Sequence, residues 1–136
     1  MSRPVLVDTS AAVALVVTDH AAHMDVMRAL GEQRLGLSGH AAFETFSVLT
    51  RLPPPVRRDG STVGLLLAEN FPENRFLDPA ATGRLFSELP ALGISGGSVY
   101  DALIGRTAAE HGLPLATRDR RALGIYRRVG AEVLSV

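Results

Sequence analysis

The sequence predicts an α/β fold in which a central parallel sheet of four to five strands is covered by helices on both sides. Short apolar runs alternate with helical patterns along the whole chain. Runs such as residues 4–7 and 113–117 are typical of strands in a parallel sheet that is buried on both faces. The 136 residues, of which 46% are hydrophobic, suffice for one domain over 1–136 with its own core.

Five elements are predicted in the first part of the chain. The first strand is an apolar run that stops at Asp8, and an alanine-rich helix follows it. The second helix places Ala22, Val26 and Leu30 on one face, and the strand after it is short. Three consecutive prolines end the third helix, because proline lacks an N–H and disfavours the α conformation in the residue before it. These elements cover residues 4–7, 11–17, 20–31, 35–38 and 40–52.

Seven further elements are predicted after the prolines. A loop leads to Gly60 and a helix, and Phe76 with Leu77 is interpreted as a brief strand. Pro79 occupies the favoured first position of the next helix, and a later helix ends at Gly112. The predicted helices are 61–70, 79–89, 98–112 and 120–129, and the predicted strands are 76–77, 113–117 and 132–136.

The composition excludes several kinds of catalytic site. All 14 basic residues are Arg, so a phosphate-binding Gly-Lys-Ser/Thr loop and a lysine Schiff base are impossible. Cys is absent, which excludes a thiol nucleophile, a Cys-based zinc site and disulfides. The apolar stretch 11–17 is far shorter than the roughly 20 residues of a membrane span, and no signal segment is recognisable. We therefore expect a cytoplasmic protein without a membrane partner.

Two aspartates lie where an open parallel sheet binds ligands. Asp8 directly follows the first strand, and Asp119 stands two residues after Thr117, at the end of a later strand. Ligands of such sheets bind at the carboxyl ends of the strands. Each aspartate also has a structural interpretation, because either can cap the helix that follows it.

Two more acidic residues lie within helical patterns. Asp101 completes a Ser-x-x-acid capping box with Ser98, yet it also lies on the small and apolar face of its helix, where a carboxylate needs a positive partner. Glu44 belongs to a nearly apolar helix; its structural interpretation is a solvated position paired with His40 or near Arg51.

Taken together, the four acidic residues are expected to meet at one edge of the sheet. Carboxylates so placed cannot all ionise unpaired, so they raise one another's pKa or bind a hard cation. Oxygen ligands suit Mg²⁺ or Mn²⁺ rather than zinc, and the chemistry that this favours is metal-assisted hydrolysis of a phosphodiester.

Four segments that contain these acidic residues resemble the PIN domain, and specifically the VapC toxins of bacterial toxin–antitoxin pairs. They occur in family order at family-like spacing, and the resemblance covers essentially the whole chain. It implies a three-layer α/β/α, PIN-like (Rossmann-like) fold. Residues 53–74, which contain the triple proline, depart from the pattern, so the RNA that is cut stays open. The matching segments are residues 5–10, 40–44, 98–104 and 115–119.

The resemblance implies a Mg²⁺- or Mn²⁺-dependent endoribonuclease. Asp8 and Asp101 are the expected direct metal ligands, while Glu44 and Asp119 would bind a second ion or orient water. In such enzymes, side-chain hydroxyls near the acidic residues hold them in place, and two residues of this chain occupy the corresponding positions. The implied catalytic residues are Asp8, Glu44, Asp101 and Asp119, and the accessory ones are Ser10 and Thr117.

The resemblance also implies partners. These are an RNA substrate (tRNA, rRNA or mRNA), a small VapB antitoxin that places an Arg among the acids, and a second copy of the chain in a homodimer. The net charge of zero hides a basic end, because residues 118–136 hold five Arg and two acidic residues. We expect Arg118, Arg120 and Arg121 to contact RNA phosphates, the alternative being a solvated helix face. A non-catalytic PIN-like module that binds RNA or protein is the alternative function.

Overall fold

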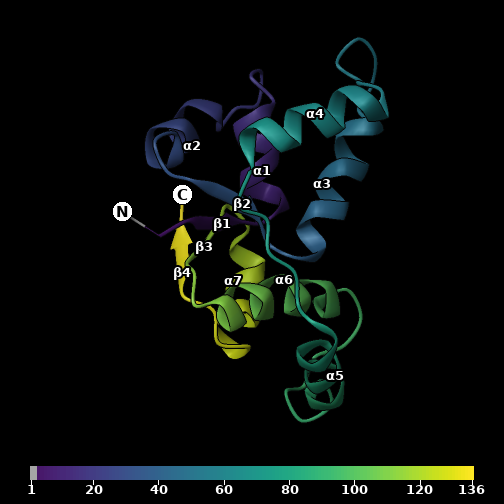
Figure 1. The fold of residues 1–136 in the computed structure, drawn as a ribbon, viewed down its shortest axis with the longest axis vertical. Coiled ribbons are helices and arrows are strands. Elements are labelled where there is room, and N and C mark those ends of the chain that lie inside the picture. Colours follow the sequence, from purple (N-terminus) through teal and green to yellow (C-terminus); the bar gives the residue numbers. More distant parts are fainter. Residues whose placement is uncertain (1–2) are drawn as a thin grey trace.

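Four parallel strands form the centre of the protein, in the order β2-β1-β3-β4 (Figure 1). The computed structural model describes residues 3–136. Leu6 of β1 pairs with Gly36 of β2 on one side and with Leu115 of β3 on the other, which fixes the register. The predicted parallel sheet is confirmed. The strands are β1 (Val5–Val7), β2 (Leu35–Leu37), β3 (Leu115–Thr117) and β4 (Val133–Ser135).

Helices cover both faces of this sheet. Figure 1 shows α1, α2 and α4 on one side and α6 and α7 on the other, which is the expected three-layer arrangement. A short 3₁₀ helix, η1 (Arg120–Ala122), leads directly into α7, where the sequence predicted one continuous helix. The α-helices are α1 (Thr9–Val16), α2 (His23–Leu30), α3 (His40–Thr50), α4 (Gly60–Asn70), α5 (Pro79–Glu88), α6 (Ser98–His111) and α7 (Leu123–Arg128).

Successive residues of β1 enter different parts of the core, because side chains alternate across a strand. Val5 and Val7 pack with buried residues of α1, α2 and α4. Leu6 packs on the opposite face with Ile104 of α6 and Tyr126 of α7. The strand is buried at all three positions, which explains why its sequence is continuously apolar.

The predicted strand at Phe76 and Leu77 is wrong, because the pairing segment lies earlier in the chain. The N–H of Glu73 donates to the Leu35 carbonyl at 3.0 Å, and Asn74 Oδ1 accepts from the N–H of Leu37 at 2.7 Å. Gly36 permits this approach, since a Cβ there would lie 1.9 Å from the Glu73 carbonyl oxygen. The segment 73–75 therefore covers the edge of the sheet beside β2.

Local signals set most helix ends. Asp59 and Asp78 cap α4 and α5 by accepting backbone N–H bonds, and Pro79 stands in the first turn of α5 as predicted. Gly112 ends α6 with a φ of +63°, a left-handed conformation that glycine adopts readily. Among residues 3–136, no helix has the length and hydropathy needed to cross a bilayer.

Candidate active site

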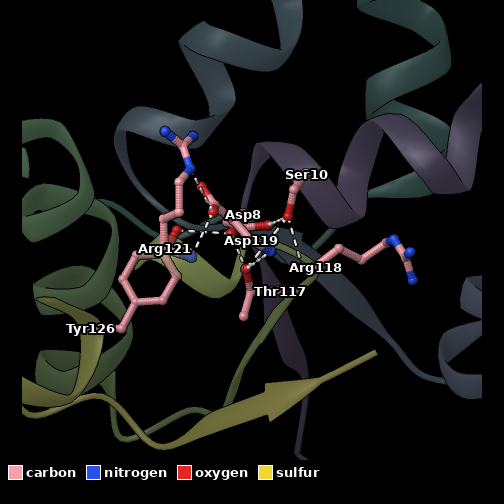
Figure 2. A network of polar contacts seen from close by, with 7 residues as sticks. All are labelled: Asp8, Ser10, Thr117, Arg118, Asp119, Arg121 and Tyr126. Atoms are coloured by element: carbon pink, nitrogen blue, oxygen red, sulfur yellow. Dashed lines mark hydrogen bonds and ion pairs between the residues drawn. The ribbon is translucent and has the colours of Figure 1, made fainter. Parts of the chain in front are cut away.

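Asp8 is the most deeply buried carboxylate of the site, with 2% of its surface exposed. Its Oδ1 accepts the backbone N–H of Ala11 at 3.0 Å, which makes Asp8 the N-cap of α1, and also the hydroxyl of Ser10 at 2.6 Å. Its Oδ2 accepts the hydroxyls of Thr117 at 2.5 Å and of Tyr126 at 2.7 Å (Figure 2). These four donors compensate for removing the charge from water.

The two hydroxyls nearest Asp8 also bind the loop that follows β3. Ser10 Oγ accepts the backbone N–H of Arg118, and Thr117 Oγ1 accepts that of Asp119, both at 2.9 Å. Each hydroxyl therefore donates to the carboxylate of Asp8 and accepts a backbone N–H of the loop after β3 (Figure 2). The ends of β1 and β3 are held together through this network.

Asp119 begins η1 at the end of the same loop. Its Oδ1 accepts the backbone N–H of Arg121 at 3.0 Å, so the helix-capping interpretation of Asp119 holds. The Arg121 side chain turns back over this carboxylate, with its Nε 3.6 Å from Oδ1, while 93% of the side chain stays exposed. The capping role leaves the second oxygen of Asp119 available for other partners.

Asp101 lies in the first turn of α6 and is partly buried. Burial raises the pKa of its carboxyl, and the negative charges of Asp119, Glu44 and Asp8 raise it further, in that order. Arg121 partly offsets the effect. The other three predicted acidic residues are therefore close enough to Asp101 for their charges to act on it.

The predicted capping box at Ser98 and Asp101 is wrong. Gly97 is the N-cap of α6, and no side chain there bonds to the helix backbone. Ser98 is already the first helical residue, so its hydroxyl is one position too late to cap. Asp101 is consequently not part of a cap at the N-terminus of α6.

Glu44 faces the site from α3. Its Oε1 lies 4.0 Å from His40 Nε2, one helical turn earlier, which matches the predicted pairing with His40. The His40 ring stacks on Tyr100, the neighbour of Asp101 in sequence, with ring centroids 4.8 Å apart. This contact joins the beginnings of α3 and α6, which carry Glu44 and Asp101.

The chemistry of these side chains fits a hard divalent cation. All four donors are carboxylates, and their mutual repulsion is visible in the raised pKa of Asp101. Across the described part of the chain, however, no three His, Asp or Glu side chains already surround a common point as metal ligands do.

Tyr126 is the member of the site that the sequence analysis missed. The sequence pattern predicts only that Tyr126 lies within a short helix, yet its hydroxyl reaches Asp8, 118 residues earlier in the chain. Burial is the main cause that raises the pKa of this hydroxyl, and the nearby charge of Asp8 raises it further, so the group keeps its proton. The available signal was chemical, because a buried tyrosine hydroxyl usually has a hydrogen-bond partner.

The three predicted RNA-binding arginines surround the same loop. Arg118 Nη1 donates to the Val136 carbonyl at 2.8 Å, and Arg121 lies over Asp119. Arg118 and Arg120 line a pocket of about 190 Å³ beside Thr117 and Asp119. The basic side chains thus border the acidic residues.

Comparison with known proteins finds relatives that match nearly the whole chain. The PIN domain family model matches residues 5–130. The chain is 42% identical over 134 residues to ribonuclease VapC27 of Mycobacterium tuberculosis, covering 98% of both chains. It is 43% identical over 127 residues to ribonuclease VapC40 of the same organism, covering 93% of this chain and 94% of the relative.

Solved structures with the same fold are more distant in sequence. VapBC2 from Rickettsia felis, bound to a DNA fragment from its promoter, aligns with a TM-score of 0.66 at 15% identity, covering 98% of this chain and 99% of that one. FitAcB from Neisseria gonorrhoeae aligns with a TM-score of 0.65 at 19% identity, covering 96% of each chain. These likenesses show the fold.

Proposed function

The chain belongs to the PIN domain family, and from this premise we propose that it is a Mg²⁺- or Mn²⁺-dependent endoribonuclease, the toxin of a type II toxin–antitoxin pair. One observation carries the proposal. Asp8, Glu44 and Asp119 all raise the pKa of Asp101 through their charge, so four carboxylates share one edge of the sheet. Two relatives that are 42% and 43% identical over nearly their whole length are named ribonucleases.

Asp8 and Asp101 are the proposed direct ligands of the ion, with Glu44 and Asp119 completing the pocket. When bound, the ion supplies positive charge that lowers the pKa of an attacking water and offsets the charge that builds on the phosphate. Ser10 and Thr117 hold Asp8 in a single orientation and connect it to the loop after β3. Such fixed geometry reduces the reorganisation needed during reaction.

RNA is the proposed substrate, whether tRNA, rRNA or mRNA. Arg118, Arg120 and Arg121 border the acidic pocket, where they can contact the phosphates on either side of the cleaved bond. Arg121 is almost fully exposed and is therefore free to exchange Asp119 for a phosphate.

The proposed protein partners are a cognate VapB-type antitoxin and a second copy of this chain. The similar structures include those named VapBC2 and FitAcB, and an acidic pocket is a good receptor for an antitoxin Arg. Homodimerisation is supported by exposed phenylalanines, because Phe43 of α3, Phe76 and Phe86 of α5 are all solvent-exposed. We also propose that residues 1–136 act as one domain in the cytoplasm.

Controlled expression in a bacterial host tests the proposal. We expect the wild-type chain to arrest growth, and the variants Asp8→Asn and Asp101→Asn to be tolerated at equal protein levels. Asp25→Asn, on the exposed surface of α2, is the matched control and should arrest growth like the wild type. If the purified chain binds RNA and never cleaves it, the non-catalytic alternative is correct.

A further inference from the structure

The carboxylate of Asp8 has no free position for a cation. Oδ1 accepts two hydrogen bonds, from Ala11 and Ser10, and Oδ2 accepts two, from Thr117 and Tyr126. A carboxylate offers about four lone-pair sites in total. A metal ion can therefore bind Asp8 directly only if one of the four donors gives up its place.

Three of these donors are tied to other groups. The N–H of Ala11 belongs to the first turn of α1, which Asp8 caps. The Ser10 and Thr117 hydroxyls also accept the backbone N–H groups of Arg118 and Asp119, so moving either hydroxyl breaks a second bond. These donors are costly to displace.

Tyr126 is the exception. Its bond to Asp8 is the one hydrogen bond of its hydroxyl within residues 3–136. The negative charges of Asp101 and Asp119 also act on this hydroxyl, so the neutral tyrosine lies among the acidic residues. Breaking the bond to Asp8 consequently frees one carboxylate position without breaking a second hydrogen bond.

We propose that Tyr126 holds the coordination position on Asp8 Oδ2 that a divalent cation takes, and that binding of the cation exchanges this hydrogen bond for a metal–oxygen contact. No proton is transferred, because the hydroxyl keeps its own proton when it leaves Asp8. Tyr126 is thus a positioning residue that stabilises the ion-free site and opposes metal binding. The inference rests on the proposed metal-dependent function, with Asp8 as a ligand.

Tyr126→Phe removes the hydroxyl and preserves the ring in the core. We expect a lower melting temperature in EDTA, because buried Asp8 loses a donor. We expect Mn²⁺ to bind about tenfold more tightly in isothermal titration calorimetry, since nothing has to be displaced from Oδ2. Tyr100→Phe, which removes the other tyrosine hydroxyl of the chain from an exposed position, should leave the affinity unchanged.

Tyr126→Phe is expected to lower stability and to raise Mn²⁺ affinity. This combination distinguishes the proposal from other roles of Tyr126. A purely structural Tyr126 predicts lower stability with unchanged Mn²⁺ affinity, and a tyrosine that prepares Asp8 for the ion predicts weaker affinity; either result overturns the proposal. If wild-type protein and Asp8→Asn both fail to bind Mn²⁺, the proposed metal site itself is wrong and the inference falls with it.

Fluorescence gives a second readout. The chain has no Trp and two Tyr, so Tyr126 is the only strong fluorophore of the Tyr100→Phe variant. A carboxylate acceptor quenches tyrosine emission, and release from Asp8 should therefore increase it as Mg²⁺ is added. Unchanged emission at Mg²⁺ concentrations that saturate the calorimetric signal would show that the bond persists, and would overturn the proposal.

Discussion

Gly105 of α6 lies so close to Tyr126 of α7 that a β-carbon at position 105 would be 3.1 Å from the Tyr126 Cα. It would also be 2.8 Å from a methyl group of Val129. Both neighbours are buried, and Tyr126 is the residue that reaches Asp8. The close contact between α6 and α7 is therefore part of what delivers the hydroxyl to the site.

Gly105→Ala tests this contact. Alanine is the better helix former, but its methyl group has to push α7 away from α6. We expect a loss of roughly 1–3 kcal/mol in the free energy of unfolding, measured by denaturant titration. Gly83→Ala in α5 is the control, since a β-carbon there meets nothing within 4 Å. It should stabilise the protein by about 0.5–1 kcal/mol, and equal effects of both substitutions would contradict the packing argument.

Thr117→Val removes a hydroxyl that donates to Asp8 and accepts the N–H of Asp119. We expect a destabilisation of about 1–3 kcal/mol, because the buried carboxylate of Asp8 and the part-buried N–H of Asp119 both lose a partner. Thr45→Val is the matched control. Thr45 is equally buried, but its hydroxyl has no hydrogen-bond partner among the described residues, so its removal should be neutral or stabilising. Denaturant titration of both variants compares a bonded with an unbonded buried threonine.

Asp101→Asn should stabilise the ion-free protein at neutral pH. The pKa of Asp101 is raised in the folded protein, so its ionised form costs stability. This cost is absent below the ordinary pKa of 3.8 and complete above the folded-state pKa. In EDTA, the variant should therefore have a higher melting temperature than the wild type at pH 7. The difference in melting temperature should vanish below the ordinary pKa of 3.8.

Asp59 has a pKa shift of the opposite sign to that of Asp101. The backbone N–H of Thr62 lowers the pKa of this helix-capping carboxyl. Stability from Asp59 is thus present above its ordinary pKa and lost as the pH falls through the folded-state value. Asp59→Ala should melt lower than the wild type at pH 7. If Asp101→Asn and Asp59→Ala both raised the melting temperature at pH 7, burial and charge repulsion would not explain the effect at Asp101.

Arg120→Ala combined with Arg121→Ala should weaken RNA binding and reduce its dependence on salt. Each lost phosphate contact is expected to lower the slope of log affinity against log salt by about 1. Fluorescence anisotropy with labelled tRNA, in EDTA to prevent cleavage, measures both quantities. Arg28→Ala, on the exposed surface of α2, is the control and should change neither. An unchanged slope in the double variant would make this cluster an ordinary solvated surface.

Much of the fold was predictable because its signals are local. The run before Asp8, the prolines after α3 and Gly112 each mark a boundary that the structure reproduces within a few residues. The strand expected at Phe76 failed for a reason that is not local. Its neighbours at 73–75 pair with β2 only because Gly36 leaves room there.

The site, like the fold, combines features that local sequence signals predict with contacts that they do not. Asp8 and Asp119 follow strands, and the parallel topology alone brings such positions to one edge. The bond from Tyr126 to Asp8 depends on how α7 packs against α6, which no short-range pattern encodes. The capping box at Ser98 failed because the helix begins one residue earlier than that pattern requires.

Cleavage of RNA by the purified chain tests the central claim most directly. Purified tRNA, rRNA and mRNA are incubated with the wild type, Asp8→Asn, Asp101→Asn and the control Asp25→Asn, in Mg²⁺, Mn²⁺ or EDTA. We predict cut products that carry a 5′-phosphate, formed by the wild type and by Asp25→Asn only when an ion is present, and by neither site variant. Cleavage that persists in EDTA, or in both Asp8→Asn and Asp101→Asn, would contradict a metal-dependent site built on these carboxylates.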